Sequence, residues 1–175
     1  MTRRRRLCFA TLMLSIVIPI ASSGNAVSGD NAVRSVPASC LVTLPPAPAF
    51  VPPDPYPAVP PDRGYTFWHG TPGLWTRLDA DGVWKGRNKL FWWSPGFHPM
   101  QTPYPPLKIT GRRLDGEAPE LQQPWVTNAR VPEWGGWTML IMLDLPSPGC
   151  WEVTGSYGAD TLSFIVWMPE VRAAR

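Results

Sequence analysis

Two alternating runs near the C-terminus constrain the fold of this chain more strongly than any other feature of its sequence. Each run places apolar residues at even spacing with polar residues between them, and the segment 158–160 separates the two runs. The apolar positions are Trp151, Val153, Tyr157, Leu162, Phe164 and Val166. This pattern predicts a β-hairpin with one apolar face. Because an isolated hairpin is only marginally stable in water, the apolar face predicts a second layer packed against it.

Short runs suited to strands recur upstream, separated by glycine and proline. They cover residues 74–78, 83–85, 89–93, 107–112, 125–131 and 137–143. No window shows the 3.6-residue period and the caps of an amphipathic helix. We therefore expect an all-β chain: an immunoglobulin-like antiparallel β-sandwich over residues 65–169, with a proline-rich N-terminal extension and a short tail at residues 170–175.

The first 26 residues have the pattern of a secretory signal peptide. Residues 3–6 form a basic head, residues 7–21 an apolar run, and residues 24–26 a small-residue cleavage site, with residues 21–23 as a competing site. The apolar run is shorter than the roughly 20 residues of a spanning helix, although an uncleaved anchor stays an alternative. We expect an extracytoplasmic protein, in the periplasm, at the cell surface or secreted, that contacts a membrane only through this segment if it is uncleaved.

The positive net charge of the chain comes from the same segment. The whole chain has 16 Lys and Arg residues against 13 Asp and Glu residues, a formal charge of +3. Removal of residues 1–26 takes away four arginines and no acidic residue, which leaves 12 basic residues against 13 acidic ones, or about −1. A nucleic-acid partner bound through net positive charge is therefore not expected.

The three cysteines predict one disulfide. Cys8 lies in the signal segment and is lost with it, which leaves Cys40 and Cys150 as a pair in an oxidising compartment. The bridge would close a loop of more than 100 residues. In the chain-entropy model, such a loop is worth about 4–5 kcal/mol of stability.

Residues 27–64 form the N-terminal extension. Residues up to about 36 are small and polar and are expected to be disordered, whereas residues 45–61 are dominated by proline. Proline fixes φ and lacks an N–H donor, so the second part is expected to be extended and to lie outside any sheet. It is either a semi-rigid spacer or a strap across the domain that tucks in Phe50 and Tyr56.

Ten tryptophans are the strongest anomaly of the composition. Trp92 and Trp93 are adjacent, so on a regular strand they face opposite sides and cannot both be core residues of a one-sided sheet. Trp134 and Trp137 flank a glycine pair. An exposed indole is a surface on which a sugar ring can stack, so these four residues form a candidate ligand face. The alternative is that bulky aromatic side chains simply stabilise a small domain.

Arg112 and Arg113 extend the candidate ligand face, because two guanidinium groups can hold a carboxylate or phosphate. The alternative is that one arginine faces solvent and the other pairs with Asp115 or Glu117 at a strand end. For the chain as a whole, the sequence predicts no catalytic residue, no metal site and no cofactor. The segment 79–82 lacks the further oxygen ligands of a calcium loop, and no Gly-x-Ser-x-Gly motif occurs.

Five segments occur in an order that resembles a group of uncharacterised bacterial secreted proteins and lipoproteins. They are residues 40–43, 73–76, 91–93, 109–115 and 149–155, and the last, Gly-Cys-Trp-Glu-Val-Thr-Gly, is the most specific. The chain departs from the group at Leu41 and over residues 134–145. The resemblance implies an extracytoplasmic β-domain with paired cysteines, and it implies no activity.

These observations favour a non-catalytic binding or structural protein of the cell envelope or the extracellular space, and not an enzyme. An enzyme or enzyme inhibitor that acts on an envelope substrate is one alternative. A carbohydrate-binding module that uses exposed tryptophans is another. The partner is not identified by the sequence; an envelope polysaccharide or another envelope protein fits either binding hypothesis.

Overall fold

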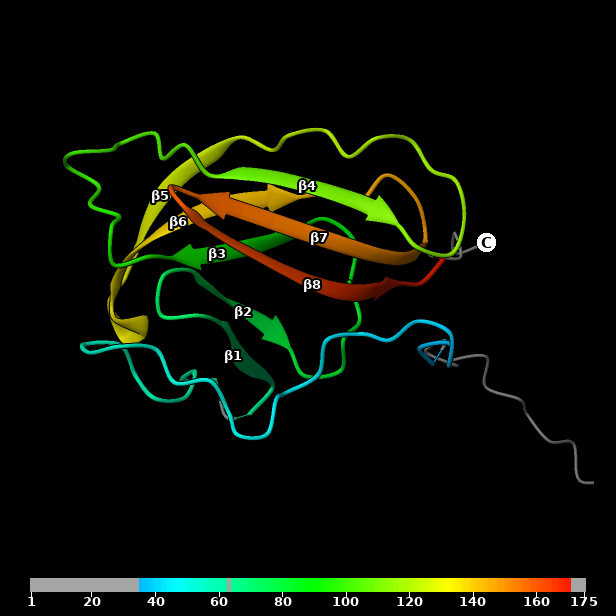
Figure 1. The fold of residues 1–175 in the computed structure, drawn as a ribbon, viewed down its shortest axis with the longest axis horizontal. Helices are drawn as coiled ribbons and strands as arrows, with labels where there is room; N and C mark the ends of the chain where they lie inside the picture. The colour runs from blue at the N-terminus through cyan, green and yellow to red at the C-terminus, as the bar shows by residue number, and fades with distance from the viewer. Residues whose placement is uncertain (1–34, 63, 171–175) are drawn as a thin grey trace, which may run out of the picture. The chain divides into compact units, whose positions relative to one another are not determined.

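The computed structural model describes residues 35–62 and 64–170, shown as the coloured ribbon in Figure 1. The predicted signal peptide, residues 1–26, lies outside the described residues, as do residues 27–34 of the extension and 171–175 of the tail. Eight strands and one short 3-10 helix are present in the described part. None of its helices is long and apolar enough to cross a membrane.

The strands form two antiparallel sheets, which confirms the predicted all-β architecture. The first sheet has the order β1-β2-β3-β6-β5, formed by β1 (Thr66–Gly70), β2 (Trp75–Asp79), β3 (Asn88–Trp93), β6 (Gly136–Leu143) and β5 (Val126–Val131). The second sheet has the order β4-β7-β8, formed by β4 (Lys108–Arg113), β7 (Gly149–Tyr157) and β8 (Asp160–Met168). The helix η1 (Pro132–Trp134) joins β5 to β6. Two sheets of this kind are consistent with a β-sandwich.

The predicted C-terminal hairpin is present as β7 and β8, with nine paired positions from Gly149–Met168 to Tyr157–Asp160. The strand expected at residues 83–85 is wrong. Asp81 Oδ1 accepts a hydrogen bond from Val83 N at 2.9 Å, and Trp84 N donates to the Trp167 carbonyl at 2.7 Å. Residues 82–84 thus lie beside β8, where Trp167 N also donates to the Gly82 carbonyl, and β2 pairs instead with β1, a strand the sequence did not indicate, and with β3.

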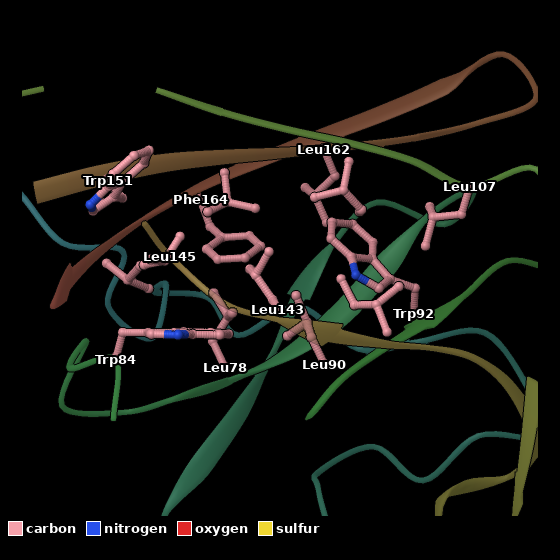
Figure 2. Packing of buried hydrophobic residues seen from close by; sticks show 14 of the residues in the cluster. Leu78, Trp84, Leu90, Trp92, Leu107, Leu143, Leu145, Trp151, Leu162 and Phe164 are labelled. Carbon is pink, nitrogen blue, oxygen red and sulfur yellow. The ribbon is translucent and has the colours of Figure 1, made fainter. Parts of the chain in front are cut away.

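The main core lies between the two sheets, where apolar side chains from both meet (Figure 2). Trp92 of β3 and Phe164 of β8 point toward one another, with ring centroids 6.1 Å apart. Gly155 of β7 makes room for the Trp92 indole, since a Cβ there would lie 2.4 Å from the ring. The absence of a side chain at one β7 position therefore lets the second sheet approach a buried tryptophan of the first.

A second apolar cluster lies on the other face of the five-stranded sheet. It consists of Trp68, Trp75 and Trp93, each at most 2% exposed, with the half-buried Phe50, Tyr56, Phe91 and Trp134 packed around them. Tyr56 meets Trp75 edge to face at 4.9 Å between ring centroids, and the Pro57 carbonyl accepts a hydrogen bond from Trp68 Nε1 at 2.9 Å. The proline-rich segment thus lies against β1 and β2 as a cover, as the cyan ribbon in Figure 1 shows.

The disulfide between Cys40 and Cys150 is present, with 5.6 Å between the two Cα atoms and a sequence separation of 110 residues. It attaches the start of the covering segment to the first residues of β7. Thr43 continues the attachment along β8, because its N–H donates to the Ile165 carbonyl and its hydroxyl accepts from Ile165 N, both at 2.8 Å. The bridge is typical of proteins in an oxidising, extracytoplasmic environment.

Candidate functional site

The structure buries two of the residues that the sequence suggested for a ligand face. Trp92 is 0% exposed within the main core, and Trp93 is 1% exposed within the second cluster. They do face opposite sides of β3, but the covering segment shields the outer side as well. Neither indole is therefore available on the surface of this structure.

The other four suggested residues do not come together as one surface. Trp134 is half-buried, with its ring 4.9 Å from that of Phe91, whereas Trp137 on β6 is 41% exposed. Arg112 and Arg113 lie on β4 in the other sheet. Arg112 pairs with Glu152 at 2.6 Å and Arg113 with Asp115 at 2.7 Å, so both guanidinium groups already hold a carboxylate.

A different aromatic pair stands out from the surface. Trp125 is 76% exposed and Tyr104 is 72% exposed, and their rings meet edge to face with centroids 6.2 Å apart. Most of the other tryptophans are buried: Trp68, Trp75, Trp84, Trp92, Trp93 and Trp151. We refer to Trp125, Tyr104 and the two hollows beside them as the Trp125 surface.

Tyr104 is exposed because its neighbours along the chain are fixed. The loop from β3 to β4 carries the sequence Pro103-Tyr104-Pro105-Pro106-Leu107. The Pro103 carbonyl accepts a hydrogen bond from Asn128 Nδ2 of β5 at 2.9 Å, whereas Pro105 is buried and Leu107 enters the main core. The prolines also restrict φ on both sides of the tyrosine. The phenol ring therefore projects outward from a backbone with little freedom.

Trp125 is exposed because of the strand that follows it. Val126, the first residue of β5, pairs with Ile141 and packs against the main core. Side chains alternate along an extended chain, so the preceding Trp125 points away from that core. Gln123 fastens the same segment to β4, since its Oε1 accepts from Ile109 N at 2.8 Å and its Nε2 donates to the Leu107 carbonyl at 3.3 Å.

Two hollows flank Trp125 and share Gln123, Pro124 and Trp125 as a common wall. The larger one, about 820 Å³, lies on the Tyr104 side and is lined by prolines, Leu107 and Lys108. The smaller one, about 370 Å³, lies over β5 and β6, where Leu140 and Met142 form an apolar floor. Its polar rim consists of Arg87, Lys89, Gln122, Thr127 and Asp144. The surface thus combines exposed aromatic rings with side chains that can form hydrogen bonds.

Cations gather at this surface without acidic partners. In residues 35–62 and 64–170, four cations take part in no ion pair with another of these residues: Arg87, Lys89, Lys108 and Arg130. The first three line the two hollows beside Trp125, where Asp144 is the one carboxylate. All of these charged side chains are exposed. The local charge is therefore positive in a mature chain that is expected to be slightly negative.

A second, more enclosed cavity of about 230 Å³ lies beneath the turn after β2. Most of its charged groups are paired, because Lys85 lies 3.1 Å from Asp81 and 3.8 Å from Asp79, and Arg77 lies 3.1 Å from Asp62; Lys89, which also lines this cavity, is the exception. Burial raises the pKa of Asp79, whereas for Asp81 the Val83 N–H and Lys85 outweigh partial burial and lower its pKa. These ion pairs and the hydrogen bond to Val83 are typical of a turn held by its own side chains, which favours a structural role for this cavity over a ligand site.

Among the described residues, no three side chains of His, Cys, Asp or Glu converge to hold a metal ion. His69 Nε2 lies 2.9 Å from the Ser163 carbonyl, which joins β1 to β8, and His98 is exposed in the loop after β3. These two side chains lie on different segments, and His69 serves to link the two sheets.

The sequence analysis missed Trp125 and Tyr104. One signal was available for Trp125, because it stands between Pro124 and the alternating residues of β5, at a position that alternation places outside the core. For Tyr104 the proline on either side was the signal. Neither pattern indicates that the two rings meet, since 20 residues and the whole of β4 separate them in the chain.

The fold and the surface together define a class: a disulfide-linked, all-β protein of two antiparallel sheets with a rigid, exposed aromatic pair. No family model, curated protein or solved structure matches the chain.

Proposed function

We propose that this protein is a non-catalytic binding protein of the cell envelope or the extracellular space, and that the Trp125 surface binds its ligand. The observation that carries the proposal is the exposure of Trp125 and Tyr104 on backbone segments held by the hydrogen bonds of Gln123 and Asn128 and by the buried Pro105 and Leu107. Large apolar side chains are usually buried where another segment of the domain can pack over them, as Tyr56 packs over Trp75 in this structure. A fixed, bare pair is typical of a binding surface.

We further propose that the sandwich is immunoglobulin-like. The orders β2-β3-β6-β5 and β4-β7-β8 correspond to the ABED and CFG sheets of a constant-type immunoglobulin domain when β1 is counted as an added edge strand. The pairing of each neighbour is antiparallel, as that arrangement requires. In such domains, loops and edges carry the binding residues while the sheets provide a rigid support.

Binding of a carbohydrate is the form of this function that the side chains favour. A sugar ring has an apolar face of C–H groups, which can stack on the indole of Trp125, and an edge of hydroxyl groups. Gln122, Thr127 and Asp144 stand beside the indole and can form hydrogen bonds with that edge. A purely apolar ligand would cover Thr127 and Asp144 without offering a hydrogen-bond partner to either, which disfavours it.

The test is affinity electrophoresis of the exported protein through gels that contain soluble polysaccharides, with co-sedimentation on purified peptidoglycan for insoluble material. We expect retardation or co-sedimentation with at least one glycan, and loss of that binding in Trp125→Ala and Tyr104→Ala. Trp137→Ala is the matched control, because Trp137 is an exposed tryptophan that lines neither hollow. Retention of binding in Trp125→Ala, or the absence of binding to every glycan, would overturn the proposal.

Extracytoplasmic location is proposed on the disulfide and on the signal sequence. Non-reducing mass spectrometry of the exported protein tests it. We expect a mature N-terminus after residue 26 and a mass two hydrogens below that of the reduced chain, from the bridge between Cys40 and Cys150. A cytoplasmic protein with free thiols would contradict the proposed location.

A further inference from the structure

We infer that the ligand of the Trp125 surface is an acidic polysaccharide, whose rings stack on Trp125 and whose anionic groups pair with Arg87, Lys89 and Lys108. This inference rests on the proposed binding function and names the class of ligand. It is argued from the distribution of charge over the described residues and from the arrangement of the two hollows.

Charge distribution is the first argument. Elsewhere in the described ranges, every cation except Arg130 is matched: Arg77 with Asp62, Lys85 with Asp79 and Asp81, Arg112 with Glu152, and Arg113 with Asp115. At the Trp125 surface, three exposed cations face one carboxylate, that of Asp144. The mature chain is expected to be slightly negative, so the excess of unpaired cations at this surface is opposite in sign to the charge of the chain as a whole. Their positive potential attracts an anionic ligand and speeds its association.

The arrangement of the hollows is the second argument. The cations are divided between the two sides of the indole, with Lys108 in the larger hollow and Arg87 and Lys89 in the smaller one. A single small anion would engage one side alone. A chain of linked sugar units can cross the indole and place an anionic group on each side, so the surface fits a polymer better than a monosaccharide.

Aromatic exposure is the third argument, and it separates a glycan from other polyanions. Cations alone would bind any acidic polymer, including an acidic peptide, through charge pairing that is weak at each site. Trp125 and Tyr104 add flat apolar area that a polyglutamate chain cannot cover by stacking. An acidic polysaccharide presents both the ring face and the charge, and it therefore satisfies both parts of the surface.

The experiment compares two forms of one polymer, polygalacturonate and its fully methyl-esterified form, so that the ligands share one sugar backbone and the ester has lost the negative charge. A phosphate-bearing glycan built of pyranose units joined by phosphodiesters is included because its anion differs from a carboxylate, and polyglutamate is included as the polypeptide polyanion. Binding of the full mature protein is measured by affinity electrophoresis and by biolayer interferometry at about 50 and 300 mM salt. We expect polygalacturonate or the phosphate glycan to bind at least tenfold more tightly than the ester.

Single substitutions Arg87→Gln, Lys89→Gln and Lys108→Gln are each expected to weaken binding of the acidic glycan by about threefold, as for exposed charge pairs. Arg130→Gln is the matched control, because Arg130 is an exposed and unpaired cation that lines neither hollow. Asp144→Asn is expected to strengthen binding of the acidic glycan and to leave binding of the ester unchanged, since it removes the one opposing charge.

The outcomes separate this inference from the proposed function. Equal binding of the acid and ester forms, lost in Trp125→Ala, would overturn the acidic ligand and leave a neutral carbohydrate-binding function standing. Equal binding of polyglutamate that survives Trp125→Ala would overturn it in favour of an acidic polypeptide. Absence of binding to every polymer would remove both. Preference for the acidic glycan that depends on Trp125 and on the three cations, but not on Arg130, supports it.

Discussion

Removal of the disulfide should cost this protein a large part of its stability. The bridge between Cys40 and Cys150 closes a loop of 110 residues, and in the chain-entropy model a loop of this size restricts the unfolded chain by about 4–5 kcal/mol. Folded domains are typically stable by about 5–15 kcal/mol. We therefore expect the double variant Cys40→Ala/Cys150→Ala to lose about a third or more of its free energy of unfolding. Alanine is chosen because both sites are buried, where serine would leave a hydroxyl without a partner.

The assay is urea denaturation followed by tryptophan fluorescence, which reports on the buried indoles of both clusters. The oxidised wild-type protein, the reduced wild-type protein and the double variant are compared. If the disulfide stabilises the protein by restricting the unfolded chain, the reduced wild type and the double variant should have the same free energy of unfolding. Both should also show a larger denaturant slope than the oxidised wild type, because an unbridged chain exposes more surface on unfolding.

The folded state itself should keep its arrangement without the bridge. The hydrogen bonds between Thr43 and Ile165 and the packing of Tyr56 on Trp75 do not depend on the sulfur atoms. We expect an unchanged fluorescence spectrum at zero denaturant for the double variant. A free energy of unfolding within about 1 kcal/mol of the oxidised protein, or a double variant that is unfolded without denaturant while the reduced wild type is folded, would refute the reasoning.

Three further predictions concern packing and charge. Gly155→Ala should lower the free energy of unfolding by about 1–3 kcal/mol, because the new Cβ would lie 2.4 Å from the buried Trp92 ring; Gly96→Ala, where the nearest atom is 3.7 Å away, is the control in the same urea titration, and equal midpoints for the two variants would contradict this. Burial raises the pKa of Asp79 in the folded state, so the folded state binds more protons than the unfolded state. The free energy of unfolding of the wild type should therefore fall relative to that of Asp79→Asn as the pH rises from about 4 toward the raised pKa. Parallel curves of stability against pH for the two proteins from about pH 3 to 7 would count against this prediction. Tyr56→Ala should lower stability by about 1–2 kcal/mol and speed proteolysis within residues 45–61, because the ring is half-buried on the second cluster; an unchanged cleavage rate would show that this residue does not hold the segment.

The alternation of residues was enough to predict much of the fold. Period-two spacing located the β7–β8 hairpin, because one face of it is buried and its register depends on that face alone. Cysteine arithmetic was enough for the bridge, since two candidates allow a single pairing. Alternation could not locate β1, because Thr66, Phe67 and Trp68 are all buried and the strand has no polar face.

The burial of both Trp92 and Trp93 could not be predicted from the alternation pattern of one strand. Their adjacency places them on opposite faces, as the structure has them, and a one-sided sheet would then leave one of them exposed. The sheet is covered on both sides, because the segment that carries Phe50 and Tyr56 lies on the outer face. That cover comes from residues about 40 positions away in the chain, and the choice between a strap and a spacer was open at the sequence level.

The cover over Trp75 also helps to interpret the exposure of Trp125. This chain has proline-rich segments that can shield aromatic side chains, and it uses one of them to bury Trp75 beneath Phe50 and Tyr56. In the loop before β4, a second proline-rich segment does the opposite, because it holds Tyr104 outward beside Trp125. Exposure there is thus not a consequence of having more tryptophans than the core can hold. Rigid prolines, the hydrogen bonds of Gln123 and unpaired cations all lie at one surface, and this combination supports the proposed binding site over a simple surplus of bulky side chains.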